Sequence, residues 1–319
     1  MKYLILPAIL FVLQILYFKI AYKFNITDKP NQRSSHATTT LRGGGVIFYI
    51  GALLYFITSG FQYPWFFIGL TLIAGISFAD DLKPRSIKLR LPIHFAAMLL
   101  MFYQWELFAQ SWYFVVLALV LCTGILNAYN FMDGINGITG GYSLVLTGTL
   151  WYINKYCVAF VDNELLYIVG LALLVFSFFN FRKKAKCFAG DVGSMSIAFI
   201  LIFLLGMLII KTGDFSYIIL LAVYGIDAVL TIIHRLILKE NIFDAHRKHV
   251  YQIMANELKI PHIAVSLIYM CLQTIIMVAF FLLFEYRYVY SICICVVLSI
   301  LYILFKKRYY PLHSKNQTK

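Results

Sequence analysis

Long apolar segments and short polar loops alternate along the whole chain. The eleven apolar segments are 3–20, 44–59, 64–79, 92–108, 112–127, 141–157, 164–180, 195–211, 216–233, 264–284 and 287–305. A helix of about 20 apolar residues crosses a bilayer, and about 17 is the usual minimum. The segments lack the alternating pattern of an outer-membrane barrel. The pattern predicts an all-α polytopic integral membrane protein with about eleven transmembrane helices, or ten if a short segment such as 44–59 does not cross.

The composition supports a membrane protein. Of the 319 residues, 62% are hydrophobic and 13% are charged, whereas soluble domains carry about a quarter charged residues. We therefore expect a single transmembrane domain over residues 1–319, with a basic tail at 306–319. The six cysteines lie mostly inside apolar segments and form no C-x-x-C pair, so we interpret them as small apolar side chains.

The basic residues predict the orientation, because cytoplasmic loops are enriched in lysine and arginine. If the N-terminus is outside, 23 of the 27 basic residues fall in the inner loops or the tail. We expect those loops and the C-terminus to be cytoplasmic. The net charge of +13 reflects this bias and gives no reason to expect a nucleic-acid partner.

The inner loop "NAYNFMDGINGITGG", residues 127–141, has four amide or acidic side chains between apolar segments. Asn127, Asn130 and Asp133 are three residues apart, so they lie along one side of a helix end and can face a polar ligand together. Asn136 follows in the glycine-rich turn.

The inner loop that begins "FADDLKPRS" has two adjacent carboxylates, Asp80 and Asp81, at the end of an apolar run. Acidic side chains are unfavourable at a helix C-terminus, so a cation should offset them. The candidates are Mg²⁺ with a phosphate and the basic residues that follow, Lys83, Arg85, Lys88 and Arg90. The alternative is a solvated turn of mixed charge.

Two further inner loops place glycines at a helix start. "LRGGG" opens the second apolar segment, where glycines allow a close backbone approach and can favour anion binding. The alternative there is a solvated linker. In "GDVGS", Asp191 lies between Gly190 and Gly193, which suits either a Mg²⁺ ligand or a helix N-cap.

The longest inner loop contains "DAHRKHVYQ". If this stretch is helical, His246 and His249 share one face, with Arg247 and Lys248 between them. This mixture fits phosphate better than zinc, which needs more ligands of this kind. The alternative is a basic loop at the membrane interface.

Asp227 lies inside the ninth apolar segment, where a charge is expensive and usually faces the protein interior. Thr231 and His234 continue the same helix stripe toward the cytoplasmic side. We expect these three supporting residues to line the site or, more in keeping with their position, to brace the loop of His246 and His249.

Four motifs in this order resemble one family. "FADDLKPRS", "NAYNFMDGING", "GDVGSMS" and "AHRKHVYQ" are similar to those of the polyprenyl-phosphate N-acetylhexosamine-1-phosphate transferases of the glycosyltransferase family 4 type. The likeness extends over roughly residues 3–305. It is nearest to the branch that initiates O-antigen and teichoic-acid linkage lipids, a relative of the phospho-N-acetylmuramoyl-pentapeptide transferase of peptidoglycan.

The resemblance implies an enzyme of the bacterial inner membrane that transfers a sugar 1-phosphate from a UDP-N-acetylhexosamine to undecaprenyl phosphate, with Mg²⁺ or Mn²⁺ as cofactor. It implies that Asp191 binds the metal and that Asp80, Asp81 and Asp133 are catalytic. The residues that we assign to substrate binding are Arg42, Asn127, Asn130, Asn136, His246, Arg247 and His249. The other partner is membrane lipid, and a homodimer is left open.

Three features depart from the family pattern. Asn136 stands where many members have aspartate, so an acid role there is not expected, and the first loop lacks a common proline before Arg42. The chain also lacks the multi-histidine run of the peptidoglycan enzyme, which argues against a muramoyl-pentapeptide donor. Two rival functions are a polytopic transporter, against which the absence of internal repeats and broken helices counts, and a non-catalytic scaffold. The identity of the amino sugar is open.

Overall fold

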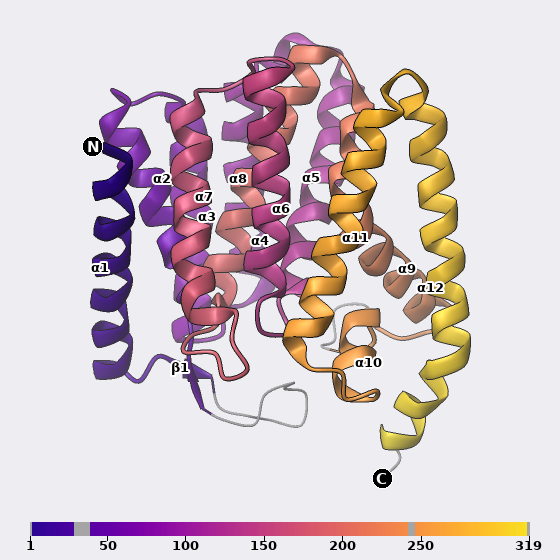
Figure 1. The fold of residues 1–319 in the computed structure, drawn as a ribbon. Helices are drawn as coiled ribbons and strands as arrows, with labels where there is room; N and C mark the ends of the chain where they lie inside the picture. The colour runs from indigo at the N-terminus through magenta and orange to yellow at the C-terminus, as the bar shows by residue number, and fades with distance from the viewer. Residues whose placement is uncertain (1, 29–38, 242–245, 318–319) are drawn as a thin grey trace.

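The protein is a bundle of long helices (Figure 1). The computed structural model describes residues 2–28, 39–241 and 246–317. The α-helices are α1 (Lys2–Lys23), α2 (Val46–Thr58), α3 (Pro64–Leu82), α4 (Ile87–Gln104), α5 (Trp112–Met132), α6 (Ile138–Tyr156), α7 (Asn163–Asn180), α8 (Gly190–Thr212), α9 (Ala222–Ile237), α10 (Val250–Asn256), α11 (His262–Leu282) and α12 (Arg287–Gln317). Three 3-10 helices are η1 (Leu107–Ala109), η2 (Phe215–Leu221) and η3 (Phe284–Tyr286), and strands β1 (Thr27–Asp28) and β2 (Thr40–Leu41) pair antiparallel.

Each of the eleven apolar segments corresponds to a helix, with η2 and α9 together forming the ninth. Among the described residues, eight helical segments are long and apolar enough to cross a membrane: those of α1, α3, α5, α7, α8, η2–α9, α11 and α12. The helix α2 is apolar but has only 13 residues. The all-α polytopic class is therefore confirmed, while the number of crossings and their orientation stay predictions.

The helix α8 lies in the middle of the bundle, and α2, α3, α5 and α6 pack against it. It is mostly buried inside the protein, whereas the exposed faces of α5 and α12 suit contact with lipid. The rings of Phe66 in α3 and Phe203 in α8 stack with centroids 4.0 Å apart. This packing places the N-terminus of α8 at the centre of one end of the bundle.

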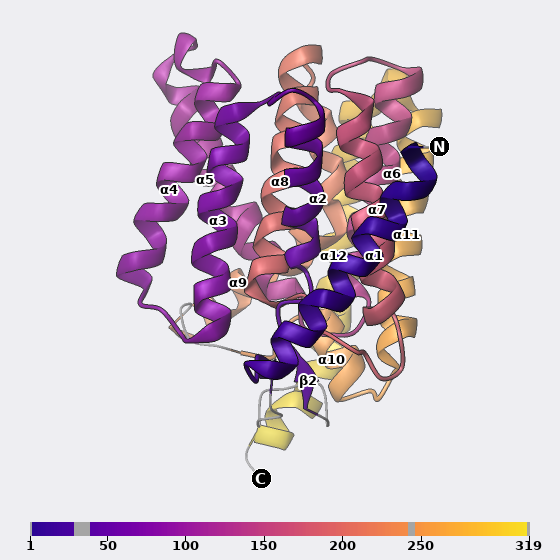
Figure 2. The same cartoon turned by 90° about the vertical axis from the view of Figure 1, so that its left-hand side faces the viewer.

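That end collects most of the polar structure. The two strands, α10 and the C-terminal part of α12 lie there, and the N-terminus lies at the other end (Figures 1 and 2). The helix α12 extends to Gln317 and so includes most of the stretch from residue 306, whose role as a basic cytoplasmic tail stays a prediction. The first inner loop joins α1 to α2 and ends in "LRGGG", and its residues 29–38 lie outside the described residues.

Candidate active site

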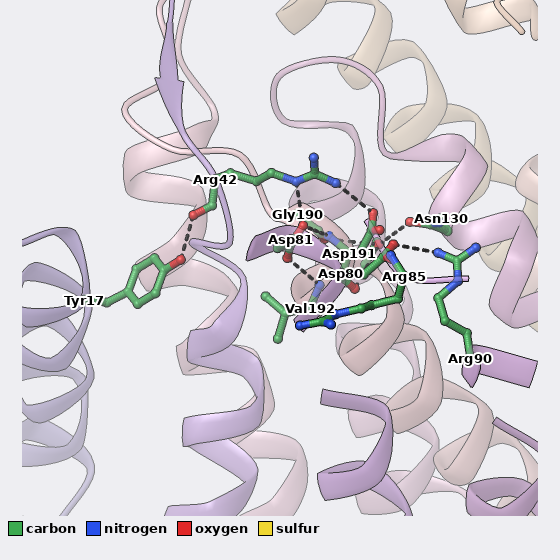
Figure 3. A network of polar contacts seen from close by, with 11 residues as sticks. Tyr17, Arg42, Asp80, Asp81, Arg85, Arg90, Asn130, Gly190, Asp191 and Val192 are labelled. Carbon is green, nitrogen blue, oxygen red and sulfur yellow. Dashed lines mark hydrogen bonds and ion pairs between the residues drawn. The ribbon is translucent and has the colours of Figure 1, made fainter. Parts of the chain in front are cut away.

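Three carboxylates from two helices meet at this end of the bundle (Figure 3). Asp80 and Asp81 stand in the last turn of α3, and Asp191 in the first turn of α8. We call these three residues the carboxylate cluster. Arg42, which follows β2, extends over the cluster from the first inner loop.

Asp81 has its hydrogen-bonding capacity filled by the protein. Its Oδ1 accepts from the backbone N–H of Asp191 at 2.9 Å and from Arg42 Nε at 2.5 Å, and its Oδ2 accepts from the N–H of Val192 at 2.9 Å. Its side chain has 0% exposure. Asp81 thus satisfies two free N–H groups at the start of α8, where a negative charge is favoured. This arrangement fits a brace between α3 and α8.

Asp80 and Asp191 are more accessible. The Asp80 carboxylate accepts from Arg90 Nη1 at 2.6 Å and from the backbone N–H of Arg85 at 2.5 Å. Asp191, with 21% of its side chain exposed, lies 3.4 Å from Arg42 Nη2, and its carboxyl group meets that of Asp80. The sequence predicted a cation beside the aspartate pair. Arg90 is that cation for Asp80, and Arg42 forms the ion pair with Asp81.

The glycines of the first inner loop place Arg42 here. Gly43 has a φ of +77°, which side chains disfavour, and a Cβ added to Gly193 in α8 would lie 2.6 Å from the Cα of Gly45. Tyr17 Oη in α1 donates to the Arg42 carbonyl at 2.6 Å. The close backbone approach expected from "GGG" is thus to α8, and it brings the Arg42 guanidinium to the cluster.

The asparagines at the end of α5 have different surroundings. Asn130 Oδ1 accepts from Ser194 Oγ in α8 at 2.8 Å, which joins α5 to the carboxylate cluster. Asn127 is exposed, and its amide donates to the Thr123 carbonyl of its own helix at 2.9 Å. The structure therefore brings Asn130 to the cluster but leaves Asn127 on the helix surface.

Asp133 and Asn136 lie in the loop after α5. Asp133 Oδ1 accepts from Thr139 Oγ1 at 2.7 Å, and burial raises the pKa of this carboxyl to about 6. The Asn136 amide is buried and donates to the carbonyl of Arg182 at 2.9 Å and to that of Lys183 at 3.3 Å. Asn136 therefore ties two inner loops together, whereas Asp133 keeps a side chain suited to proton exchange near neutral pH.

The longest inner loop, which contains His246 and His249 and is called the fifth inner loop from here on, packs on Asp227 of α9. The Asp227 carboxylate accepts from Tyr269 Oη at 2.6 Å, from the backbone N–H of Val250 at 3.0 Å and from Thr231 Oγ1 at 3.3 Å. The Nδ1 atom of His249 lies 3.4 Å from its Oδ1. Asp227 thus has the contacts of a brace for this loop.

His246 and His249 are not on one helix face, because α10 begins only at Val250. Their rings nevertheless stack, with centroids 5.0 Å apart, beside Phe131 at the end of α5. Burial lowers the pKa of His246 to about 3, and its Nδ1 accepts from the Lys248 N–H at 3.4 Å. His246 is therefore neutral at pH 7. Beside the two stacked rings, the partly exposed Arg247 can supply positive charge to a phosphate.

The remaining residue of the Asp227 stripe points elsewhere. His234 packs edge-on against Tyr310 of α12, with ring centroids 4.6 Å apart. This contact turns the His234 ring toward α12. Thr231 instead contacts Tyr302 Oη of α12 at 2.9 Å as well as Asp227.

Sequence reasoning missed the residues that support these side chains from distant segments. Tyr17 and Tyr269 come from α1 and α11 and carry no local signal, whereas Ser194 of α8 is part of the motif "GDVGS" but was given no role. Tyr251 is another, and its Oη donates to the Phe131 carbonyl at 2.8 Å. Only its position directly after "AHRKHV" could have marked it.

The donor set near Asp191 fits a hard divalent cation. Among the described residues, no group of three or more histidine, cysteine or acidic side chains is arranged to hold a metal ion. Asp80 and Asp191 do face each other, and Asp81 is occupied by N–H groups and Arg42. Mg²⁺ is commonly held by one or two carboxylates together with phosphate oxygens and water. Two carboxylates are therefore enough for a Mg²⁺ ion that arrives with a diphosphate.

Fold and site together define a polytopic membrane protein with a carboxylate–arginine centre at one end of the helical bundle. Residues 63–209 match the family model described as glycosyl transferase family 4. The chain is 25% identical over 259 residues to the probable undecaprenyl-phosphate N-acetylglucosaminyl 1-phosphate transferase of Bacillus subtilis, covering 73% of this chain and 70% of that protein.

Two other relatives are named undecaprenyl-phosphate alpha-N-acetylglucosaminyl 1-phosphate transferase. The protein of Yersinia pestis is 28% identical over 214 residues, 59% of this chain and 56% of its own. That of Escherichia coli K12 is 28% identical over 229 residues, 63% and 60% of the two chains. The chain therefore spans less than two thirds of the length of these two relatives. The matches confirm the family resemblance that the four motifs predicted, to the polyprenyl-phosphate N-acetylhexosamine-1-phosphate transferases.

Proposed function

We propose that the protein transfers an N-acetylhexosamine 1-phosphate from a UDP-sugar to undecaprenyl phosphate. An oxygen of the lipid phosphate forms a bond to the sugar-bearing phosphorus of the donor, and the bond from that phosphorus to UMP breaks. The products are a lipid diphosphosugar and UMP. The proposal places this reaction at the cytoplasmic face of a bacterial inner membrane, as the first step of a cell-surface polysaccharide such as O-antigen.

One observation carries the proposal: the carboxylate cluster and Arg42 meet at the end of a bundle of apolar helices. Transfer between two phosphates needs charge neutralisation above all, and an acceptor with an isoprenoid tail needs a site that opens to lipid. Asp80 and Asp191 lie at the ends of α3 and α8, two helices that are long and apolar enough to cross a membrane. The names of the relatives favour this reaction over other phosphate chemistry.

The contacts of each side chain suggest its role in the reaction. Asp191 and Asp80 would hold Mg²⁺, which supplies positive charge to the phosphoryl oxygens. Asp80, which is more accessible than Asp81, is the better candidate to take a proton from the lipid phosphate. Arg42 reaches the same place with a guanidinium that is one-third exposed, so it can contact a phosphate there.

The second half of the site would bind the donor. The stacked His246 and His249 lie beside Phe131, two residues before Asp133, so the fifth loop adjoins the loop after α5. Arg247 follows His246 and is partly exposed. We assign the sugar and diphosphate of the donor to this side and the lipid phosphate to the side of Asp80.

The test is turnover of a radiolabelled UDP-sugar by the purified protein with undecaprenyl phosphate and Mg²⁺. The expected products are a labelled lipid and UMP in equal amounts, and a panel of UDP-N-acetylhexosamines identifies the sugar. A transporter would move substrate across vesicles without releasing UMP, and a scaffold would do neither. Absence of labelled lipid with every donor of the panel would overturn the proposal.

A further inference from the structure

The segment of α12 at the cytoplasmic end of the bundle contacts the fifth inner loop through a buried lysine. Lys306 is 6% exposed, and its Nζ donates to the backbone carbonyl of Lys248. Burying an ammonium group is unfavourable unless it finds good partners. The rings of Tyr302 and Tyr310 provide two more, with centroids 5.4 Å and 5.3 Å from Nζ.

This contact fixes the peptide that leads into His249. The carbonyl before His249 belongs to Lys248 and is bound by Lys306, while the N–H after it belongs to Val250 and is bound by Asp227 at 3.0 Å. The N–H of His249 itself donates to Gln252 Oε1 at 3.2 Å. The main chain is therefore held on both sides of this histidine, so its ring orientation depends on α9 and α12 together.

The ammonium group of Lys248 and its backbone carbonyl have different partners. Its Nζ pairs with Glu240, which also binds Arg235 Nε at 3.2 Å. Glu240 thus pairs with two cations, and Lys306 adds a further positive charge beside Lys248. Because the Lys248 ammonium is held by Glu240, the hydrogen bond of Lys306 to this residue is made to its main-chain carbonyl.

We propose that Lys306 is a positioning residue: by binding the Lys248 carbonyl it sets His249, and with it the stacked His246, in the orientation that receives the donor. The proposal rests on the proposed function for the identity of the donor. Lys306 itself belongs to α12 and binds the loop at the main-chain carbonyl of Lys248. Its effect should therefore appear in donor affinity and leave the lipid acceptor unaffected.

The test compares Lys306→Met with Lys306→Arg and with Lys307→Met. Methionine keeps the long apolar stem but donates no hydrogen bond, whereas arginine keeps a cationic donor. Lys307 is exposed on the next position of the same helix, so Lys307→Met removes the same charge without touching the loop. The readouts are the KM for the UDP-sugar, the KM for undecaprenyl phosphate, and the rate of trypsin cleavage after Arg247 and Lys248.

We expect Lys306→Met to raise the donor KM about tenfold, as for the loss of one hydrogen bond from a charged group. The acceptor KM should change less than about twofold, and trypsin cleavage should accelerate. Lys306→Arg should recover most of the donor affinity, and Lys307→Met should match the wild type. If Lys306→Met is not recovered as folded protein, Tyr310→Leu removes one ring beside Nζ, and the same direction of change is expected.

Equal rises in both KM values would show a general structural defect and overturn the proposal. Wild-type donor KM with wild-type cleavage in Lys306→Met would overturn it as well. Should the wild-type protein turn over no UDP-sugar, the proposed function fails, while the cleavage comparison of the three variants still decides whether Lys306 fixes the loop.

Discussion

The carboxylate cluster and the fifth inner loop lie at the same end of the bundle, but their charges are balanced in opposite ways. Among the described residues, the three acids of the cluster form ion pairs with two arginines, Arg42 and Arg90. Around the fifth loop, Glu240 is shared by Arg235 and Lys248, and Lys306 adds a further positive charge. The cluster therefore favours a cation and the fifth loop an anion, and a UDP-sugar with Mg²⁺ brings both.

The comparison also separates two tasks of aspartate. Asp81 and Asp227 are both buried and accept backbone N–H groups from another segment, Val192 and Val250 respectively. Within the described part of the chain, Asp191 accepts no comparable backbone bond, and its side chain is partly exposed. A buried aspartate that binds main-chain N–H groups acts as a brace, whereas an exposed one beside other acids can bind a ligand.

The largest effect is expected for Asp191→Asn. Removing one of three neighbouring negative charges relieves repulsion but weakens cation binding, so turnover should fall more than about a hundredfold. Thermal unfolding should detect the weaker cation binding without an activity assay. Wild-type protein should gain stability with Mg²⁺ by mass action, and the variant should not. Mg²⁺-dependent stabilisation of the variant equal to that of the wild type would exclude Asp191 as a ligand.

Asparagine at Asp80 and at Asp81 should have different consequences. Asp80→Asn should lower kcat about a hundredfold or less with little change in unfolding temperature. Asp81→Asn breaks a buried pair and an N–H contact at α8, so a loss of about 3 kcal/mol in stability is expected. The check is kcat and thermal unfolding of both variants side by side. Identical stability of the two variants would break the distinction between brace and ligand.

The sequence predicted which elements form and which polar side chains gather at one end. The eleven apolar segments became helices because lipid leaves the backbone no other partner for its N–H and C=O groups. Asp80, Asp81 and Asp191 came from motifs at the ends of such segments, where the short loops leave them little choice of position. Their meeting was thus predictable from topology and charge.

Pairings set by three-dimensional packing were not predictable. Arg90 was a candidate partner for the aspartate pair, but the pairing of Arg42 with Asp81 depends on glycines packing against α8. The sequence assigned Asn136 to substrate binding. Its amide instead donates to the backbone carbonyl of Arg182 in the next inner loop. The sequence placed His246 and His249 on one face only if their stretch were helical, but the two rings stack in a loop that precedes α10.

A smaller effect is expected for Asp227→Asn. One oxygen remains for Tyr269 or for the Val250 N–H, so the fifth loop should loosen without unfolding. The donor KM should rise about fivefold, and trypsin should cleave faster after Arg247. The acceptor KM serves as the internal control. Unchanged donor KM and unchanged cleavage would mean that the brace functions without the negative charge.

The smallest effect at neutral pH is expected for Thr139→Ala, because it acts only on the proton of Asp133. Burial raises the pKa of Asp133 to about 6, and the Thr139 hydroxyl at 2.7 Å opposes this rise. Loss of that hydrogen bond should raise the pKa of Asp133 by about one unit. If ionised Asp133 is the active form, the acidic limb of kcat moves from about pH 6 to about pH 7, and activity at pH 7 falls about twofold.

The contribution of Asp133 to the stability of the folded protein changes with pH in a definite direction. The pKa of Asp133 is raised in the folded protein, from 3.8 to about 6, so the folded state binds this proton more tightly than the unfolded state does. Its contribution to stability is fully present below pH 3.8 and is lost as the pH rises to about 6. Asp133→Asn should remove this dependence on pH from the unfolding temperature measured between pH 4 and 7.

Asp133→Asn should also abolish the shift of the kcat limb in the Thr139→Ala background. A limb that moves with Thr139→Ala even when residue 133 is asparagine would belong to another group, and the neighbouring carboxylate cluster would then be the first place to look, since the charge of Asp81 also acts on Asp133.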